Sequence, residues 1–323
     1  MTAKPKNYIF WKMGVFLFLC VFCFAGASKV FAYKIENTGD NTTHGDFAIG
    51  PGKIELEINP GESKIVNITV TNRMGDERVF NFETEDFTGS QDTTQTAVLL
   101  GDERGPYSLK DYISVPEWSF TLKNGERAIV PVTVSIPTDA QPGGLYGSLL
   151  TSTASKPNAE KIGPTSTIVA RLGTLIFITI PGPVNHDGQL TKFETNGGKQ
   201  IYASGPIDFR LIYENKGSVY VNPYGKISIK NMLGEEVKNI EVEPWYALPG
   251  ALRLREVHWD SSFLMGRYTA IASINRGYDN IIDTKEFSFW VIPIKLFATV
   301  VIAIVVLLFG LRFVLTRFEI RKK

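Results

Sequence analysis

The sequence is poor in the residues that carry most enzymatic chemistry. Among 323 residues it has two cysteines, Cys20 and Cys23, and both lie in the apolar N-terminal stretch. Residues 33–289 therefore offer no thiol nucleophile, no disulfide and no cysteine-based metal site. The histidines are scattered along the chain, at His44, His186 and His258. Motifs for a serine nucleophile elbow, a His-Glu-x-x-His zinc site and a phosphate-binding loop are absent, so we expect no catalytic residue, no cofactor and no metal.

Net charge is also small, but only when it is averaged over the chain. With 34 Lys and Arg against 33 Asp and Glu the whole sequence carries +1, yet residues 1–32 carry +4 and residues 290–323 carry +5. Residues 33–289 consequently carry −8. A body of this sign has no electrostatic footprint for phosphate backbones, so nucleic acid is excluded as an expected partner. The chain has an acidic middle between two basic, apolar ends.

The first 32 residues have the pattern of a secretory signal peptide. A basic start precedes an apolar run at 13–27, and this run fits the roughly 7–15 residues of a signal-peptide core. Val30-Phe31-Ala32 provides a cleavage site before Tyr33, and Ala25-Gly26-Ala27 provides a second one. An uncleaved anchor is the alternative, although the run is short for the ~20 residues of a membrane span. Residues 33–45 are polar and are expected to form a flexible N-terminal segment.

The C-terminal region predicts a transmembrane helix at 290–315. No residue of 296–311 is charged, and about 20 apolar residues suffice to cross a bilayer. Lys295 and Arg312 lie at the edges of the run, and Trp290 stands where interfacial aromatic residues are found. Residues 316–323 form a basic tail, which the positive-inside rule places in the cytoplasm. The sequence thus predicts a single-pass protein of the cell membrane, with an extracellular or periplasmic body.

The middle of the chain alternates between apolar and polar residues, as half-buried strands do. The run 64–72 places Val66, Ile68 and Val70 on one face, and the run 128–136 follows the same pattern. Pro131 interrupts the second run and has no backbone N–H, which favours an edge position or a bulge. Turn signals rich in Gly and Pro recur throughout. The expected fold class is all-β: two tandem Ig-like antiparallel β-sandwiches plus one C-terminal transmembrane helix.

A repeated turn-and-strand pattern, which we call the internal echo, and a proline-rich segment that ends strand pairing define the two domains. Pro60-Gly61-Glu62 and Asn124-Gly125-Glu126 each precede a strand of the pattern V-x-[IV]-x-V, which suits a single Ig-like domain at 46–183. Its last strand is expected at 166–180, before Pro181-Gly182-Pro183. The second domain is expected at 184–289, with strands at 207–213, 226–230, 267–274 and 284–289. Because the last strand leads directly into the span, this domain should lie near the bilayer and the first domain farther out.

Three acidic or mixed clusters are candidate sites of chemistry. Glu83-Thr84-Glu85-Asp86 is expected to be a solvated acidic loop, since it lacks the ligand spacing of a calcium-binding EF-hand. Asp279-Asn280-Ile281-Ile282-Asp283 is interpreted in the same way. In His258-Trp259-Asp260 we expect a core tryptophan with the histidine on the opposite face of the strand. The polar segment 86–110 is long for a connection in a compact domain, which indicates either a functional loop or disorder.

Several motifs, in order along the chain, resemble the WxL-interacting proteins of bacterial surfaces. Those proteins have a signal peptide, two Ig-like domains and a C-terminal transmembrane segment. The motifs are Ile58-Asn59-Pro60-Gly61-Glu62, Ile136-Pro137 before Gly143-Gly144-Leu145-Tyr146-Gly147, Glu214-Asn215-Lys216-Gly217, Asn222-Pro223-Tyr224-Gly225, Leu248-Pro249-Gly250 before Trp259, and Gly266-Arg267-Tyr268. The resemblance implies peptidoglycan binding by the first domain and host-surface or partner binding by the second. The segment 86–110 departs from the family, and no binding residue of the family maps onto this chain.

Three functions follow from these observations. The first is a membrane-anchored binding or scaffold protein that engages peptidoglycan or a surface protein through strand edges or loops. The second is an accessory subunit of an envelope secretion or assembly complex. The third is a hydrolase acting through Glu83, Glu85 or Asp86, which would require two carboxyls roughly 5–5.5 Å apart in a cleft if it were a retaining glycosidase. The sequence does not identify the binding residues.

Overall fold

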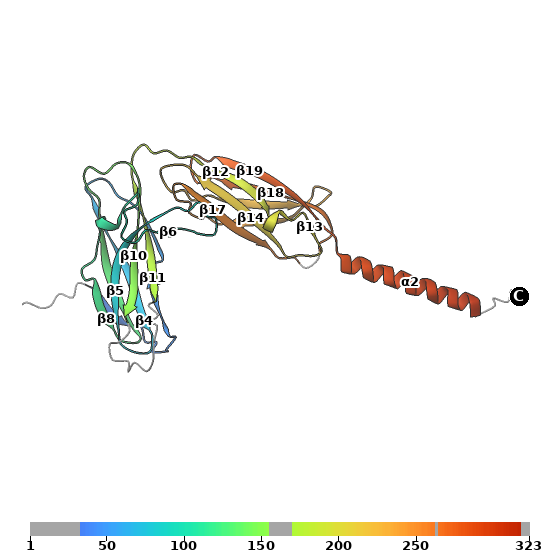
Figure 1. Ribbon diagram of the computed structural model, residues 1–323, viewed down its shortest axis with the longest axis horizontal. Coiled ribbons are helices and arrows are strands. Elements are labelled where there is room, and N and C mark those ends of the chain that lie inside the picture. Colours follow the sequence, from blue (N-terminus) through green and yellow to red (C-terminus); the bar gives the residue numbers. More distant parts are fainter. Residues whose placement is uncertain (1–32, 155–169, 262–263, 318–323) are drawn as a thin grey trace, which may run out of the picture.

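A computed structural model describes residues 33–154, 170–261 and 264–317. In this part of the chain two β-sandwiches follow one another, and a long helix leaves the second sandwich (Figure 1). The expected fold class, two β-sandwiches with an apolar C-terminal helix, is confirmed. The expected signal peptide at 1–32 and the end of the basic tail at 318–323 lie outside the described residues.

The first sandwich contains strands β1 to β11. One sheet has the order β1-β9-β4-β2, with the short β7 beside β9, and the other has the order β3-β11-β10-β5-β6, with β8 beside β5. The β3–β11 pair is parallel. The elements are β1 Lys34–Asn37, β2 Asp46–Gly50, β3 Lys53–Glu57, β4 Ser63–Arg73, β5 Arg78–Thr88, β6 Val98–Leu99, the 3-10 turn η1 Lys110–Tyr112, β7 Ile113–Ser114, β8 Ser119–Leu122, β9 Glu126–Ser135, β10 Gly143–Ala154 and β11 Arg171–Ile180.

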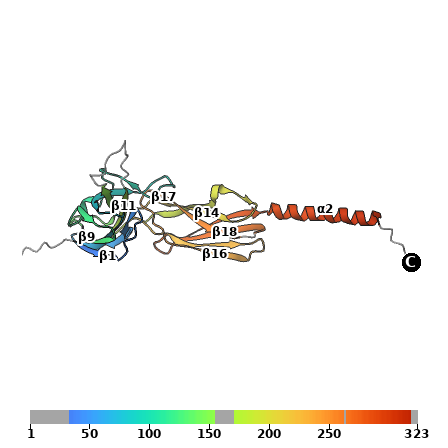
Figure 2. The ribbon, with the colours of Figure 1, turned by 90° about the horizontal axis from the view of Figure 1, so that it is seen from below.

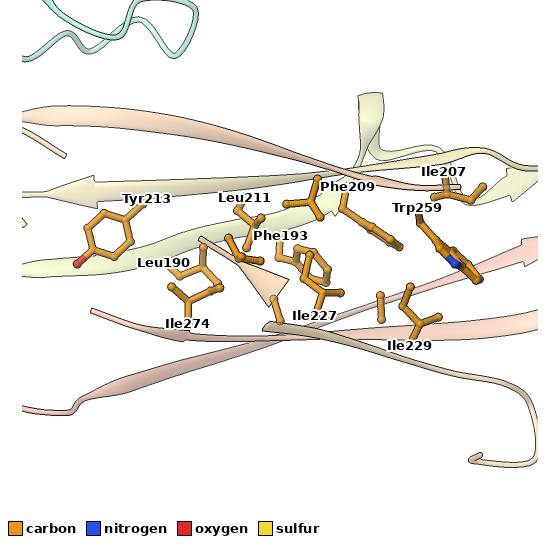
Figure 3. Close-up of a cluster of buried hydrophobic side chains, with 14 of the residues drawn as sticks. Leu190, Phe193, Ile207, Phe209, Leu211, Tyr213, Ile227, Ile229, Trp259 and Ile274 are labelled. Carbon is orange, nitrogen blue, oxygen red and sulfur yellow. The ribbon is translucent and has the colours of Figure 1, made fainter. Parts of the chain in front are cut away.

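The second sandwich packs a sheet of order β12-β14-β17 against a sheet of order β13-β19-β18-β15-β16. Its elements are β12 Gly188–Thr195, the 3-10 turn η2 Asn196–Gly198, β13 Ile201–Tyr202, β14 Ile207–Asn215, β15 Tyr224–Lys230, β16 Glu236–Val242, β17 Ala251–Trp259, β18 Gly266–Asn275 and β19 Ile282–Val291. Figure 3 shows how Phe209, Leu211 and Trp259 from one sheet meet Ile227 and Ile229 from the other. This apolar layer is the core of the domain.

The period-2 alternation in the sequence corresponds to strands with one buried face. Ile68 and Val70 of β4 are buried together with Val130 and Val132 of β9, whereas Ile65 of β4 is two-thirds exposed (67%). The two echoing segments are neighbours in one sheet, since Val132 lies opposite Val66 and Val130 opposite Ile68. The echo therefore marks two adjacent strands that bury the same face.

Two boundaries differ from those expected. Residues 33–45 were expected to be flexible, but β1 lies in this segment and pairs with β9 through Lys34 opposite Ile129. Tyr33, partly buried, also packs against Phe120, with ring centroids 5.3 Å apart, and so holds this segment against the domain. At the other end, Trp290 and Val291 still belong to β19, so the helix begins at residue 294 rather than 290.

The helix α2, Ile294–Arg317, projects away from the second sandwich (Figures 1 and 2). Its segment Ile294–Phe313 has 20 residues and a mean hydropathy of 2.8, and none of it is buried in the protein. At 1.5 Å per residue such a segment spans about 30 Å, the thickness of a bilayer's hydrocarbon core. By length and composition, α2 is therefore able to cross a membrane.

Candidate functional site

The two sandwiches meet through a cluster of aromatic side chains. Phe87, Tyr146 and Phe177 of the first domain are buried against Leu248 and Ala251 of the second. The Phe177 ring lies 5.0 Å from the ring of Tyr220 and 5.1 Å from that of Tyr246, both from the second domain. Aromatic pairs at such distances add about 0.5–1.5 kcal/mol beyond the burial of their area. The junction is thus packed like a small core and holds the domains against each other.

Polar contacts across the same junction fix how the two domains are placed against each other. The Tyr220 backbone N–H donates to the Tyr146 hydroxyl at 2.7 Å, and the Asn222 side-chain amide donates to Glu55 at 3.1 Å. Burial opposes ionisation of Glu55, but the hydrogen bonds from Lys53 and Asn222 outweigh it and hold the pKa of Glu55 below its ordinary value. Burial, followed by the charge of Glu55, raises the pKa of Tyr220 to about 12. An ionised glutamate therefore faces a neutral tyrosine at the domain boundary.

A segment of the first domain, residues 89–91, extends this junction to the edge of β17, and we call it the arm. The arm leaves the end of β5 and crosses to the second domain (Figure 1). There the carbonyl of Ser90 accepts a hydrogen bond of 2.9 Å from the backbone N–H of Leu252, and the Gln91 side chain donates to the Gly250 carbonyl. A Cβ at Gly89 would lie 2.7 Å from the Ala251 Cβ, so only glycine allows this approach.

The arm is held at its base by the carboxylate of Asp86, which is fully buried on β5. It accepts hydrogen bonds from the backbone N–H groups of Gly105, Leu109 and Lys110, at 3.1, 2.9 and 2.9 Å. Burial alone would raise its pKa, but hydrogen bonds from the Ser108 hydroxyl and these N–H groups lower the pKa of Asp86 below its ordinary value. The segment 86–110 is therefore an ordered loop, pinned at residues far apart in sequence.

The expectation of a solvated acidic loop at Glu83-Thr84-Glu85-Asp86 was wrong. All four residues lie on β5, where they pair with β10. Glu83 and Glu85 share one face and both pair with Arg171 of β11, with 2.6 Å between Arg171 and Glu83. Asp86 accepts the hydrogen bonds that hold the segment 86–110, as described above. These carboxylates therefore hold the structure together and do not face each other across a substrate site.

The outer edge of β17 is the exposed backbone surface beside this junction. Backbone direction alternates along a strand, so if the N–H of Leu252 points to the arm, those of residues 254, 256 and 258 point the same way. The backbone N–H groups of Leu254, Glu256 and His258 therefore point away from β14, to the side where no described strand pairs with β17. Within the described residues, this edge is therefore free beyond its first hydrogen bond.

Two of these residues, Glu256 and His258, carry exposed polar side chains that contact residues of β14. Arg210 of β14 lies 3.6 Å from Glu256, and His258 Nδ1 lies 2.5 Å from Asp208 Oδ1. Trp259 is buried and His258 is exposed, which confirms the expectation for this pair. The carboxylate beside His258 comes from the neighbouring strand and not from Asp260. Both members of the pair are about half exposed, and the arrangement presents a hydrogen-bonded surface beside the open edge.

The remaining acidic cluster is a tight turn. Asp279 and Asn280 have φ values of 50° and 52° and connect β18 to β19, while Asp283 accepts hydrogen bonds from Arg276 and from the Leu190 backbone N–H. Among the residues that the structure describes, no group of three or more His, Cys, Asp or Glu is placed to hold a metal ion.

Sequence reasoning did not locate the β17 edge or the junction. The run 251–259 alternates like any half-buried strand, and no local pattern shows which neighbour it lacks. Two residues of the junction do occur in the motifs named above, Tyr146 in Gly143-Gly144-Leu145-Tyr146-Gly147 and Leu248 in Leu248-Pro249-Gly250. Both are buried where the domains meet, but the motifs by themselves do not indicate a contact between domains.

No family model matches the chain, and no curated protein matches it. Among solved structures it is similar to the class 5 fimbriae chaperone CfaA, at 13% identity over 77% of this chain and 100% of that one, with a TM-score of 0.37. It is also similar to a chain of the CsuC–CsuE chaperone–tip adhesion subunit complex of Acinetobacter baumannii, at 13% identity over 75% and 97% of the two chains, with a TM-score of 0.36. Similarity at this level does not assign a function.

Proposed function

We propose that this chain is a membrane-anchored extracytoplasmic binding scaffold that takes up an extended segment of a partner protein along the outer edge of β17. The single observation that carries the proposal is the hydrogen bond from Leu252 N–H to Ser90 O. At this point the edge strand already forms a backbone hydrogen bond with a segment from outside its own sheet. The backbone groups of Leu254, Glu256 and His258 extend the same row, as β-strand addition requires.

The anchoring part of the proposal combines both ends of the chain. The helix α2 is long and apolar enough to span a bilayer, and a secretory signal pattern precedes the body. The basic residues after the span favour a cytoplasmic C-terminus. In this topology both sandwiches are outside the cytoplasm, and the packed junction presents the β17 edge at a defined angle to the first domain.

A protein partner fits the edge better than an anionic wall polymer does. Residues 33–289 carry a net charge of −8, which repels polyanions at long range. Backbone hydrogen bonding, by contrast, recognises any extended peptide and obtains specificity from flanking side chains. The resemblance to WxL-interacting proteins supports a surface location, and we propose that relationship as well.

The edge can be tested by site-specific cross-linking in membranes. A photoreactive benzoylphenylalanine at His258 should give a cross-linked protein adduct in cells that make the full chain. Glu256→Pro removes the outward N–H without touching the ladder to β14, because proline is tolerated at an edge. It should reduce the adduct at least tenfold. The matched variant Glu256→Ala loses the same carboxylate but keeps the N–H, and should retain the adduct.

Equal adducts from Glu256→Pro and Glu256→Ala would show that the edge backbone is not used. Sedimentation of the purified full chain with isolated peptidoglycan separates the alternative ligand. Peptidoglycan binding that both variants retain, without any protein adduct at His258, would replace the proposed partner by the wall polymer.

A further inference from the structure

One end of the second sandwich carries exposed apolar side chains on several separate loops and strand ends. Met232 and Leu233 are 68% and 77% exposed at the turn between β15 and β16, and Met265 is 54% exposed just before β18. Trp290 and Ile201 are also exposed, on the paired ends of β19 and β13. We call these five residues the apolar cap. Such a group is larger than the scattered apolar residues of an ordinary polar surface.

Strand register places the cap at the end of the domain from which α2 leaves. Gly266 pairs with Val291, the last residue of β19, and Lys230 at the end of β15 pairs with Thr269. The position of a Cβ on Gly266 lies 3.4 Å from the Met232 sulfur, so the β15–β16 turn reaches the start of β18. In Figure 2 the strand β16 reaches the end of the sandwich from which α2 leaves.

The turn that carries Met232 and Leu233 is rigid. The Asn231 side-chain oxygen accepts hydrogen bonds from the backbone N–H groups of Leu233 and Glu235, at 2.9 and 3.0 Å. The Asn231 backbone N–H donates to the Glu235 carbonyl at 2.9 Å. Two apolar side chains are thus held at the tip of a fixed turn.

The connection between domain and helix is short and also fixed. Only Ile292 and Pro293 separate β19 from α2. The Ile292 N–H donates to the Tyr202 carbonyl at 2.8 Å, and the Ile294 N–H donates to the Ile292 carbonyl at 2.8 Å. Since a chain advances at most ~3.6 Å per residue, the end of the domain lies within about 10 Å of the first helical residue.

We infer that the apolar cap docks into the headgroup region of the bilayer that α2 spans. This inference rests on the proposed anchoring. The 20 residues of Ile294–Phe313 fill the ~30 Å hydrocarbon core, and the interfacial region beyond it is about 5–8 Å deep on each side. A domain end within about 10 Å of the first helical residue lies at or just outside that depth. Tryptophan is enriched there, and apolar side chains beside cationic ones bind such interfaces.

Two cationic residues beside the apolar cap suit lipid phosphate. Arg267 is the cross-strand neighbour of Trp290, and with Lys230 it lines a pocket of about 520 Å³ beside Met232. Glu235 and Glu236 lie at the same end, where they bond to Asn231 and Ser228. Cations and carboxylates are thus mixed, so the cap is suited to phospholipid phosphate in general rather than to anionic lipid in particular. Docking would hold the second domain in one orientation and direct the first domain away from the membrane.

The test uses the full chain with Cys20→Ser and Cys23→Ser, in nanodiscs of phosphatidylethanolamine and phosphatidylglycerol at one chain per disc. A fluorescent nitrobenzoxadiazole label is attached to Leu233→Cys and challenged with lipids that carry nitroxide at the headgroup. Ile65→Cys, 67% exposed in the first domain, is the matched reference, and Val306→Cys, 65% exposed in α2, reports the span. We expect at least twofold stronger quenching at Leu233→Cys than at Ile65→Cys.

Equal quenching at these two positions, with quenching at Val306→Cys by lipids that carry nitroxide in the acyl chain, would overturn the docking and leave the anchor intact. Absence of quenching at Val306→Cys by acyl-chain nitroxide would overturn the anchor itself. A second measurement places the label at Met265→Cys, where Leu233→Asp should reduce headgroup quenching by at least half. Val237→Asp, at an exposed position of β16 four residues after Leu233, should leave that quenching unchanged. Reduction by both variants would show a general loss of structure instead of a contact with lipid.

Discussion

At the scale of single residues, Asp86 shows how one buried carboxylate orders a long segment. Its oxygens bond to backbone N–H groups as far as 24 residues along the chain. Hydrogen bonds to a charged group contribute about 1.5–3 kcal/mol each in favourable cases. The loop 86–110 thus depends on a side chain that appears, in the sequence, to belong to an acidic stretch.

Substitution of Asp86 should expose this role. Asp86→Asn keeps the shape but loses the charge and part of the accepting capacity, so we expect a loss of about 2 kcal/mol in the free energy of unfolding at pH 7. Because the folded pKa of Asp86 is lowered, its stabilisation is complete above the unfolded value of about 4 and disappears as pH falls through the folded value. Denaturation of the detergent-solubilised chain between pH 7 and pH 2 should show a smaller acid-induced loss for the variant.

Asp102→Asn is the control for that experiment, because Asp102 is exposed in the same segment. Its free energy of unfolding should stay within about 0.5 kcal/mol of the wild-type value. An Asp86→Asn curve that follows the wild type at all pH values would contradict the role given to this carboxylate.

Gly89 provides a second residue-scale prediction, at the contact between domains. Gly89→Ala would bring a Cβ to 2.7 Å from the Ala251 Cβ and 2.9 Å from the Pro249 carbonyl oxygen. We expect the arm to be displaced and stability to fall by about 1–3 kcal/mol, as overpacking does. Spin labels at Ile65→Cys and Val237→Cys, with the native cysteines replaced, should give a broader interdomain distance distribution. Gly52→Ala has open space around its Cβ and should leave the distribution unchanged.

At the scale of elements, the echoing segments show what local sequence can specify. Gly61 and Gly125 have φ values of 81° and 80°, a region that glycine adopts readily. In both turns the following glutamate N–H bonds back three residues at 3.1 Å, from Glu62 to Asn59 and from Glu126 to Lys123. The same short sequence therefore makes the same turn and opens the same kind of strand.

Pro131 illustrates a local gap in strand pairing, where the sequence favours an edge position or a bulge. On the side of β9 away from β4, β1 lies opposite 126–129 and β7 opposite 133–134, and Pro131 falls between them. The missing N–H faces this gap: the Ile136 N–H, five residues on, bonds to the Glu62 carbonyl on the β4 side, and the Gly125 carbonyl, six residues back, accepts from Thr38 on the β1 side. Pro131 therefore lies at a locally unpaired position of an inner strand, where proline blocks pairing with another chain.

Replacement of this proline should open the gap. Pro131→Val restores an outward N–H with little effect on the free energy of unfolding, within about 1 kcal/mol, but should increase self-association. Sedimentation velocity of the solubilised chain over a range of concentrations would measure it. Thr133→Val is the control, since Thr133 is already covered by Ser114 of β7. Equal association of both variants would point to added hydrophobicity instead of the open edge.

At the scale of the whole molecule, the two ends and the body make a topological prediction. Trypsin added to intact spheroplasts should degrade both sandwiches, because the acidic body is expected outside the cytoplasm. An epitope tag placed after Lys323 should survive on a short fragment that contains α2. A tag lost from intact spheroplasts, or a body protected until detergent is added, would contradict this orientation.

The sequence by itself determined the strand-rich body and the apolar C-terminal span. Alternation and long apolar runs are properties of neighbouring residues, so β4, β9 and β18 could be located from a few side chains each. The tertiary structure alone decided that 34–37 forms a strand, that Asp86 is buried, and that β17 has an open side. Each of these depends on which distant segment lies alongside. Local periodicity cannot encode that choice, because the same alternating strand fits the middle of a sheet or its edge.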